Sequence, residues 1–308
     1  MGNVLMKYMA RNHQGKGNAY IAALYGHTLY PDEAQYYGKI DFYLVDHSVS
    51  SRVRKLQMIY DGGCRVFLEY PHTARPNIID DIYVPWPNMT AQFVAAAGHV
   101  EILRRYGNTK DIHVAGWSLC PIREFVPHKL KNVLFAPIHP RNVDMDKNVN
   151  RAAFDILYKL AQKGIINLSV RYVGNYDDCG LHKVDDKRVK YIQGSLDLSY
   201  TDMDVADLVI SHQTYAWLAV ARGIPCVMMA EDMPMHSVPR TGDPLLAKHW
   251  DDYKELLMFP LDILNTDDPL TLLQRAVETD ADILDWKRRM IGDPFDADRF
   301  IEIVKGYI

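Results

Sequence analysis

Short apolar runs alternate along the chain with amphipathic stretches whose apolar residues recur at helical spacing. In the first part, the apolar runs predict strands at 3–9, 41–45, 64–70 and 111–116, and the amphipathic stretches predict helices at 19–29, 51–60 and 91–106. The pattern then restarts, with strands predicted at 132–137, 167–173, 189–192, 206–210 and 226–230, and helices at 150–163, 215–222 and from 270 onward. Such alternation is typical of βαβ units, whose strands form parallel sheets.

The two series of strands and helices predict an α/β protein with two doubly wound, Rossmann-like domains that face a central cleft. We place the first domain at 1–125, the second domain at 126–290, and a C-terminal helix at 291–308 that packs back on the first domain. Ligands of such sheets bind beyond the carboxyl ends of the strands. The cleft between the domains is therefore the expected site.

The composition is that of an ordinary globular protein and bears on where the protein is located. The 308 residues are 48% hydrophobic and 24% charged, and the four cysteines are far apart. Reduced thiols, a start without signal-peptide character and the lack of any run of ~20 apolar residues favour a cytoplasmic protein that does not span a membrane. A formal net charge of −4 argues against a main task of gripping nucleic acid.

The most informative stretch is 206–233, ADLVISHQTYAWLAVARGIPCVMMAEDM. A buried strand ends in small and polar residues, a helix follows at once, and Gly-Ile-Pro leads into another strand. Backbone N–H groups at the start of this helix are free to bind an anion, and the helix dipole adds to the attraction. A diphosphate fits this turn, whose candidate ligands are Ser211, His212, Gln213, Thr214 and Tyr215.

This stretch resembles the carboxyl-terminal domain of the GT-B superfamily. That superfamily includes nucleotide-sugar glycosyltransferases, UDP-sugar 2-epimerases and CDP-glycerol glycerophosphotransferases. The resemblance implies a nucleotide-sugar donor, with a UDP-linked sugar as the first candidate. It implies that the donor binds the domain at 126–290 and that the domain at 1–125 lies on the acceptor side. It also places Glu231 and Asp232 against the donor sugar hydroxyls. Weaker similarities are seen in NVLFAPIHPRN at 132–142, AGWSLCP and GDPFDADRFIEIV.

Three further residues are candidates for donor binding. His139 and Arg141 follow the strand NVLFAP, and arginine suits paired phosphate oxygens. Gly174 follows the strand at 167–173, where it would let a nucleotide approach the backbone. One position departs from the superfamily: many members carry a ribose-binding glutamate seven residues before the Gly-x-Pro proline, and here that residue is Leu218.

On the acceptor side, the loop RNHQGKGN follows the first strand. His13 in this loop is our candidate for the general base that removes an acceptor hydroxyl proton, and Lys16 could approach a phosphate. Strand ends supply the remaining candidates: Asp46 as a second acid or base, and Glu69 and His72 on the acceptor side.

Metal and other cofactors are not expected. The sequence has no HExxH motif, no DxDxDG loop, no clustered Cys and His, no Walker loop and no GxGxxG after the first strand. We therefore expect a metal-independent glycosyltransferase, as a monomer or homodimer, that stabilises its leaving diphosphate electrostatically.

Several alternatives stay open. The same fold could transfer an alditol phosphate, epimerise a UDP-sugar at C2, or bind a nucleotide without turnover. The acceptor could be a glycan, a lipid-linked sugar, a small molecule, a protein or a hydroxymethylated DNA base. DNA would gain support from a basic strip that faces the cleft, made of Arg52, Arg54, Lys55, Arg65 and Arg75.

Overall fold

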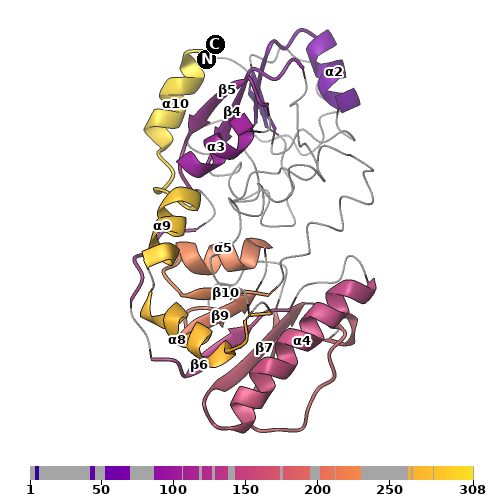
Figure 1. Ribbon diagram of the computed structural model, residues 1–308. Coiled ribbons are helices and arrows are strands. Elements are labelled where there is room, and N and C mark those ends of the chain that lie inside the picture. The colour runs from indigo at the N-terminus through magenta and orange to yellow at the C-terminus, as the bar shows by residue number, and fades with distance from the viewer. Residues whose placement is uncertain are drawn as a thin grey trace. The chain divides into compact units, whose positions relative to one another are not determined.

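The computed structural model is an α/β fold built on two parallel sheets (Figure 1). It describes residues 4–6, 42–45, 53–69, 87–105, 107–117, 120–126, 129–137, 143–173, 176–194, 202–211, 213–229, 263–264, 266–279 and 281–307. Every strand pair among these residues is parallel, which confirms the predicted fold class. Contacts divide the chain into two compact units, 1–119 with 288–308, and 120–287. The predicted domain boundaries remain predictions.

The first unit contains a sheet whose described strands lie in chain order, β1-β2-β3-β4-β5. These strands are β1 (Val4–Met6), β2 (Phe42–Val45), β3 (Val66–Glu69), β4 (Ala91–Val94) and β5 (Asp111–Val114), and the helices between them are α2 (Val53–Asp61) and α3 (Ala97–Arg105). The helix predicted at 19–29 lies outside the described residues.

Strand β4 overturns part of the sequence prediction. The pattern predicts one helix over 91–106, but Ala91–Val94 form a fully buried strand between β3 and β5, and the helix begins only at Ala97. A strand that is buried on both faces shows no alternation of apolar and polar residues. Its sequence therefore looks like the start of an apolar helix.

The last described helix, α10 (Ala297–Lys305), completes the core of the first unit. Phe300 and Val304 on α10 are at most 1% exposed and pack with Leu68 of β3 and Phe93 of β4. The Asp296 side chain accepts a hydrogen bond of 2.9 Å from the backbone N–H of Arg299, which caps the helix start. Backbone hydrogen bonds from Trp117 to Asp293 and from Phe295 to Trp117 hold the preceding segment in place.

The second unit contains a sheet of order β10-β9-β6-β7-β8. Its strands are β6 (Asn132–Phe135), β7 (Asn167–Val173), β8 (Val189–Gly194), β9 (Leu208–Ser211) and β10 (Cys226–Met228). Its helices are α4 (Val143–Gln162), the 3-10 helix η3 (Tyr176–Cys179), α5 (Gln213–Ala221), α8 (Pro269–Glu278) and α9 (Ala281–Met290), the last of which ends in the first unit.

Strand order in this sheet reverses between β6 and β9. The chain builds outward from β6 through β7 to β8, then returns to place β9 on the other side of β6. Loops that leave the carboxyl ends of two such strands diverge in opposite directions. In open parallel sheets, the crevice between two such loops is the usual ligand site.

Helix α4 is longer than the sequence predicts. The apolar spacing predicts a helix at 150–163, whereas α4 begins at Val143. The extra turns come from the polar sequence VDMDKN, which has no apolar face to reveal it.

Candidate active site

The strand order of the second sheet reverses between β6 and β9, and we call the carboxyl ends of these two strands the switch point of the sheet. All four residues of β9 are buried, and α5 begins at Gln213, two residues beyond the end of β9 at Ser211. The first N–H groups of any α-helix have no acceptor within the helix, and they carry the positive end of its dipole. The predicted strand-to-helix turn is therefore present, and the first backbone N–H groups of α5 follow the carboxyl end of β9, next to β6 in the sheet.

Ser211 forms hydrogen bonds to the residues that follow two neighbouring strands. Its side chain is 2% exposed, and its hydroxyl donates a hydrogen bond of 3.1 Å to the carbonyl of Ala136, just beyond β6. Its own carbonyl accepts a hydrogen bond of 3.1 Å from the N–H of Met229, just beyond β10. Ser211 thus fixes the carboxyl ends of three strands, and donor binding by its side chain stays a prediction.

A buried arginine lies beside the first turn of α5. Arg171 on β7 is 5% exposed, its Nε donates a hydrogen bond of 3.1 Å to the carboxylate of Asp202, and its guanidinium carbon is 4.9 Å from the ring centroid of Tyr215. Neither Arg171 nor Asp202 is among the site residues predicted from the sequence. The available signal was a single charged residue within the apolar strand NLSVRYV.

Gly194 makes room for this arginine. A Cβ added at Gly194 would lie 2.7 Å from Nε of Arg171 and closer still to the rest of the guanidinium. The glycine at the end of β8 therefore has a packing reason that is independent of any nucleotide. It allows the cation to reach Asp202 and Tyr215 across the carboxyl edge of the sheet.

Tyr215 contributes a polar group to the same place. Burial raises the pKa of its phenol, and the positive charge of Arg171 opposes that rise. Tyr215 consequently stays protonated at neutral pH and remains a hydrogen-bond donor. Its phenolic oxygen is buried and has no hydrogen-bond partner within the described part of the chain. A buried hydroxyl of this kind needs a partner, which a bound ligand or a water can supply.

The Gly-Ile-Pro segment after α5 is a helix stop. Gly223 has φ +75°, its N–H donates to the carbonyl of Val220 at 3.0 Å, and the N–H of Ile224 donates to the carbonyl of Ala219 at 2.9 Å. This pair of hydrogen bonds is the Schellman motif, which favours glycine at the left-handed position. Leu218, at the position of the ribose-binding glutamate, is completely buried and offers no polar group to a ligand.

Among the acceptor-side candidates, the side chain of Glu69 alone is described. It lies at the carboxyl end of β3, is 4% exposed, and accepts a hydrogen bond of 2.7 Å from the side-chain amide of Gln92 on β4. The Gln92 carbonyl in turn contacts the amide of Asn108. Glu69 therefore belongs to a buried polar chain at the sheet edge that is predicted to face the acceptor.

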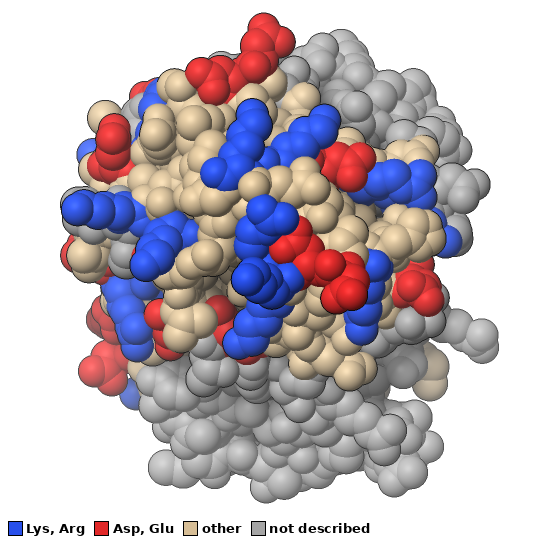
Figure 2. Space-filling view, turned by 90° about the horizontal axis from the view of Figure 1, so that it is seen from below, with Lys and Arg blue, Asp and Glu red and all other residues tan. Residues whose placement is uncertain are grey.

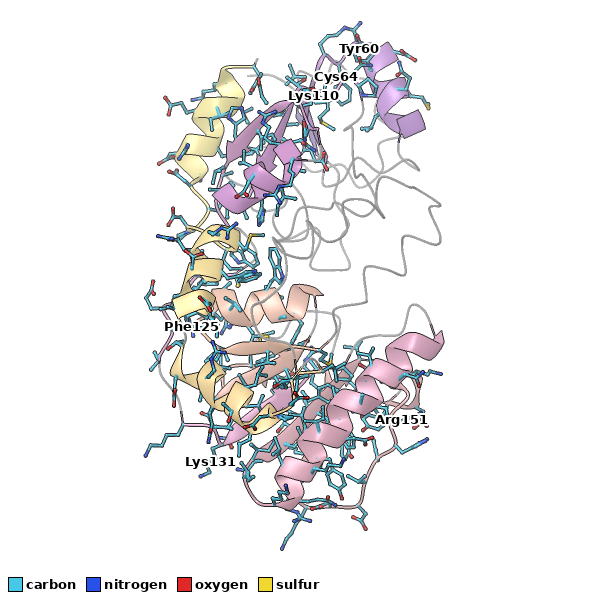
Figure 3. All side chains as sticks on the ribbon, in the orientation of Figure 1. Tyr60, Cys64, Lys110, Phe125, Lys131 and Arg151 are labelled. Carbon is cyan, nitrogen blue, oxygen red and sulfur yellow. The ribbon has the colours of Figure 1, made fainter. Side chains whose placement is uncertain are left out.

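The basic strip finds no support from Arg65. This residue precedes β3, at the opposite edge of the sheet from the strand ends, and its guanidinium stacks 4.3 Å from the ring centroid of Tyr60. It also donates a hydrogen bond of 3.1 Å to the carbonyl of Cys64, which lies near Tyr60 in Figure 3. Arg65 is thus packed locally rather than placed at the carboxyl edge.

The other predicted site residues lie outside the described residues: His13, Lys16, Asp46, His72, His139, Arg141, Gly174, His212, Glu231 and Asp232. The backbones of Gln213 and Thr214 are described, but their side chains are not. Within the described ranges, no group of three His, Cys, Asp or Glu side chains could hold a metal ion. No helix in those ranges is long and apolar enough to cross a bilayer.

Comparison with known proteins gives a fold and no family. No protein-family model matches the sequence, and a search of curated proteins finds no match either. Among solved structures, a co-structure of S. aureus MnaA with UDP is similar over 100% of this chain and 97% of that one, with a TM-score of 0.51 and 12% identity. The wall teichoic acid polymerase TagF is similar over 99% of this chain and 88% of that one, with a TM-score of 0.54 and 12% identity.

At this identity the likeness concerns the fold alone. Both structures match nearly the whole of this chain, and the parallel sheets and the switch point between β6 and β9 agree with that likeness. The chain therefore has a parallel, Rossmann-like α/β fold similar to that of these two solved structures.

Proposed function

We propose that the protein is a glycosyltransferase whose nucleotide-sugar donor binds at the carboxyl edge of the second sheet, with its diphosphate at the start of α5. The observation that carries this proposal is the turn from Ser211 to Gln213, which presents helix N–H groups at the switch point of the sheet. The similar fold of a protein solved with UDP supports the choice of ligand class.

Electrostatics at this turn suits the departure of a diphosphate. In glycosyl transfer, an acceptor oxygen forms a bond to the anomeric carbon while the bond from that carbon to the diphosphate breaks. Negative charge then accumulates on the leaving nucleoside diphosphate, where the amides of α5 and its dipole stabilise it. The nearby guanidinium of Arg171, although paired with Asp202, adds positive potential to the same edge.

The remaining roles follow the sequence analysis and are part of the proposal. His13 accepts the acceptor proton in an inverting displacement, with Asp46 as the second acid or base. Arg141 and His139 hold the diphosphate from the loop after β6, and Glu231 with Asp232 bind the sugar hydroxyls. Catalysis is proposed to need no metal, so activity should persist in EDTA.

A nucleotide screen is the first test. UDP, GDP, CDP and TDP are each added to the full chain, and thermal unfolding is followed. A ligand present at ~100 times its dissociation constant should stabilise the fold by about 2.7 kcal/mol. Failure of all four nucleotides, and of their sugar conjugates, to shift the melting temperature would remove the proposal.

A variant of one backbone donor tests the location. Gln213 is the first residue of α5, where a helix tolerates proline, and Gln213→Pro removes the N–H at that position. An amide bonded to a charged group contributes about 1.5–3 kcal/mol, so UDP affinity measured by calorimetry should fall about 10-fold to 150-fold. Gln213→Ala, which keeps the N–H, is the matched control and should bind UDP like the native protein.

The likeness to a wall teichoic acid polymerase favours a second candidate, the transfer of an alditol phosphate from a nucleotide-linked donor. The two chemistries release different products. Glycosyl transfer breaks the sugar C–O bond and releases a nucleoside diphosphate, whereas alditol-phosphate transfer breaks the P–O bond within the diphosphate and releases a nucleoside monophosphate. Phosphorus NMR of the products separates them, and nucleotide binding without either product would indicate an inactive module.

A further inference from the structure

Lysines gather at the edge of the second sheet where the strands begin. β6 and β7 pair from Asn132 with Asn167, and β7 pairs with β8 from Leu168 with Val189, so the segments that lead into these strands lie side by side. The end of α4 at Gln162 adjoins them through its contact with Arg188. All basic side chains of these segments are exposed, and we call them the lysine edge: Lys129, Lys131, Lys159, Lys163, Lys187, Arg188 and Lys190.

Few carboxylates compensate this charge. Asp186 is bound by Arg188, whose Nε and Nη2 lie 2.8 and 2.7 Å from its oxygens. That pair leaves six lysines against Asp155, Asp185 and Asp207, an excess of three positive charges, in a chain whose formal net charge is −4. Figure 2, seen from below, shows Lys and Arg side chains on this end of the second unit with Asp and Glu side chains among them, and Figure 3 labels Lys131 there.

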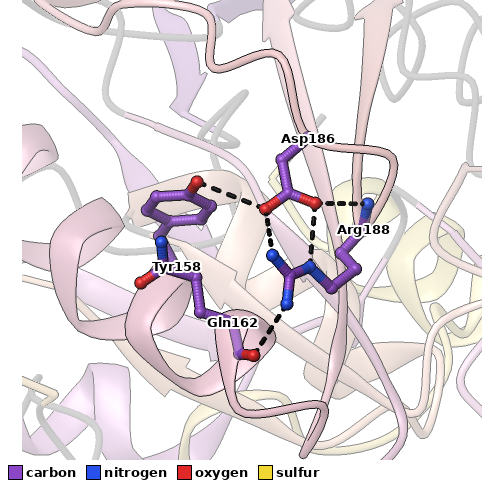
Figure 4. Close-up of polar contacts among 4 residues, drawn as sticks. All are labelled: Tyr158, Gln162, Asp186 and Arg188. Carbon is purple, nitrogen blue, oxygen red and sulfur yellow. Dashed lines mark hydrogen bonds and ion pairs between the residues drawn. The ribbon is translucent and has the colours of Figure 1, made fainter.

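A network of hydrogen bonds holds the backbone beneath the lysine edge in place. Besides binding Asp186, Arg188 donates a hydrogen bond of 2.7 Å from Nη1 to the carbonyl of Gln162 at the end of α4 (Figure 4). The hydroxyl of Tyr158 donates a bond of 3.2 Å to the same carboxylate. These contacts fix the end of α4 against the start of β8, so the lysines between them are held on one surface.

The composition of this surface favours a lipid partner over a nucleic acid. Nucleic-acid surfaces commonly use arginine and exposed aromatic rings for bidentate and stacking contacts. Here the uncompensated cations are all lysines, and no aromatic side chain in these described segments is exposed. Two of the exposed large apolar residues of the described chain, Val126 and Val205, lie in the segments that lead into β6 and β9. A cluster of exposed lysines suits an anionic membrane surface.

We propose that the lysine edge docks the protein on an anionic lipid bilayer. The donor site proposed above lies at the carboxyl edge of the same sheet, so docking at the opposite edge leaves that site accessible to its ligands. This inference does not depend on the proposed function, because it concerns a different surface and a different partner.

Vesicle sedimentation of the full chain tests the proposal. The probes are vesicles of phosphatidylcholine alone and vesicles with about one third phosphatidylglycerol, where each lysine near the surface should strengthen binding about fivefold. Removing three such charges should therefore weaken binding about 100-fold. The test variant replaces three edge residues: Lys131→Gln, Lys163→Gln and Lys187→Gln. The control variant removes the same charge from exposed residues of the first unit: Arg105→Gln, Arg299→Gln and Lys305→Gln.

The expected result is that the native chain and the control variant sediment with the anionic vesicles at low salt, and that the edge variant does not. The melting temperature of the edge variant should match the native value, since none of the three edge lysines has a described structural contact of its side chain. The control variant loses the exposed ion pair between Arg105 and Glu101, so its melting temperature should fall only slightly. Equal binding to both vesicle types, or equal binding by the edge variant and the native chain, would overturn the proposal. Binding of a DNA duplex through the same lysines, without vesicle binding, would also overturn it.

Discussion

His99 makes the first unit sensitive to acid. It is completely buried on α3, and its Nε2 lies 2.8 Å from the carbonyl oxygen of Met290, so this nitrogen carries a hydrogen and donates it. Burial lowers the pKa of His99 from 6.5 to about 4, and the hydrogen bond to Met290 opposes that shift only partly. The folded chain therefore binds a proton less readily than the unfolded chain, and stability falls as the pH drops below 6.5.

The size of the effect follows from the two pKa values. A shift from 6.5 to about 4 makes the unfolded state more favourable by about 2 kcal/mol at pH 5 relative to pH 7. That loss is a sizeable part of an ordinary free energy of unfolding of about 5–15 kcal/mol. His99→Gln keeps a donor for the Met290 carbonyl and removes the titrating group, so the variant should lose about 2 kcal/mol less between the two pH values.

Urea unfolding at pH 7 and pH 5, followed by circular dichroism, measures this difference. His182→Gln is the control, because His182 is exposed, and it should keep the full pH dependence of the native protein. Parallel loss of stability in the native chain and in His99→Gln, within about 0.5 kcal/mol, would refute the reasoning and show that His99 can be protonated without cost in the folded state.

Three further substitutions test the packing described above. Gly223→Ala should lower the free energy of unfolding by at least about 1 kcal/mol, because alanine disfavours the left-handed backbone at this position. The loss should be larger still, because the added Cβ would clash with the carbonyl oxygen of Glu124. Gly164→Ala is its control in thermal unfolding, since Gly164 has φ +71° but nothing within 4 Å, and equal losses would contradict the steric part. Arg188→Met should lower the melting temperature at pH 7 and somewhat less at pH 3, because the arginine holds the pKa of Asp186 well below its usual value. At pH 3 the unfolded carboxyl is largely protonated while the folded one is still paired, so part of the benefit is already lost; a loss independent of pH would exclude the ion pair as its cause. Arg171→Met should reduce the free energy of unfolding in urea by about 2 kcal/mol, since it leaves a half-buried carboxylate without its cation, and an unchanged midpoint would count against this pairing.

Much of the second sheet could be predicted from the sequence. The strand at 167–173 has the predicted bounds, because polar and apolar residues alternate along it from Asn167 to Tyr172. The start of α5 was also predictable, since a small polar residue ends an apolar run directly before a helical one. In the first unit, β4 escaped prediction because a strand covered on both faces carries no alternation.

The candidate site was predictable only where the backbone forms it. The turn after Ser211 is a property of local sequence, and the structure contains it. The pairing of Arg171 with Asp202 joins residues 31 positions apart through a tertiary contact, and nothing in the local pattern of either residue indicates the other. The space for that pairing depends on Gly194, whose role becomes apparent only when β7 and β8 are side by side.

The packing of α10 has a consequence for how the chain folds during synthesis. Phe300 and Val304 complete a core that also contains Phe93, so side chains about 200 positions apart must meet before the first unit is closed. Residues 120–287 emerge in one continuous piece and have all their strands before α10 leaves the ribosome. The unit that contains the amino terminus is therefore expected to finish folding last, and its apolar sheet face needs protection from aggregation, by a chaperone or by transient contacts, while the nascent chain grows.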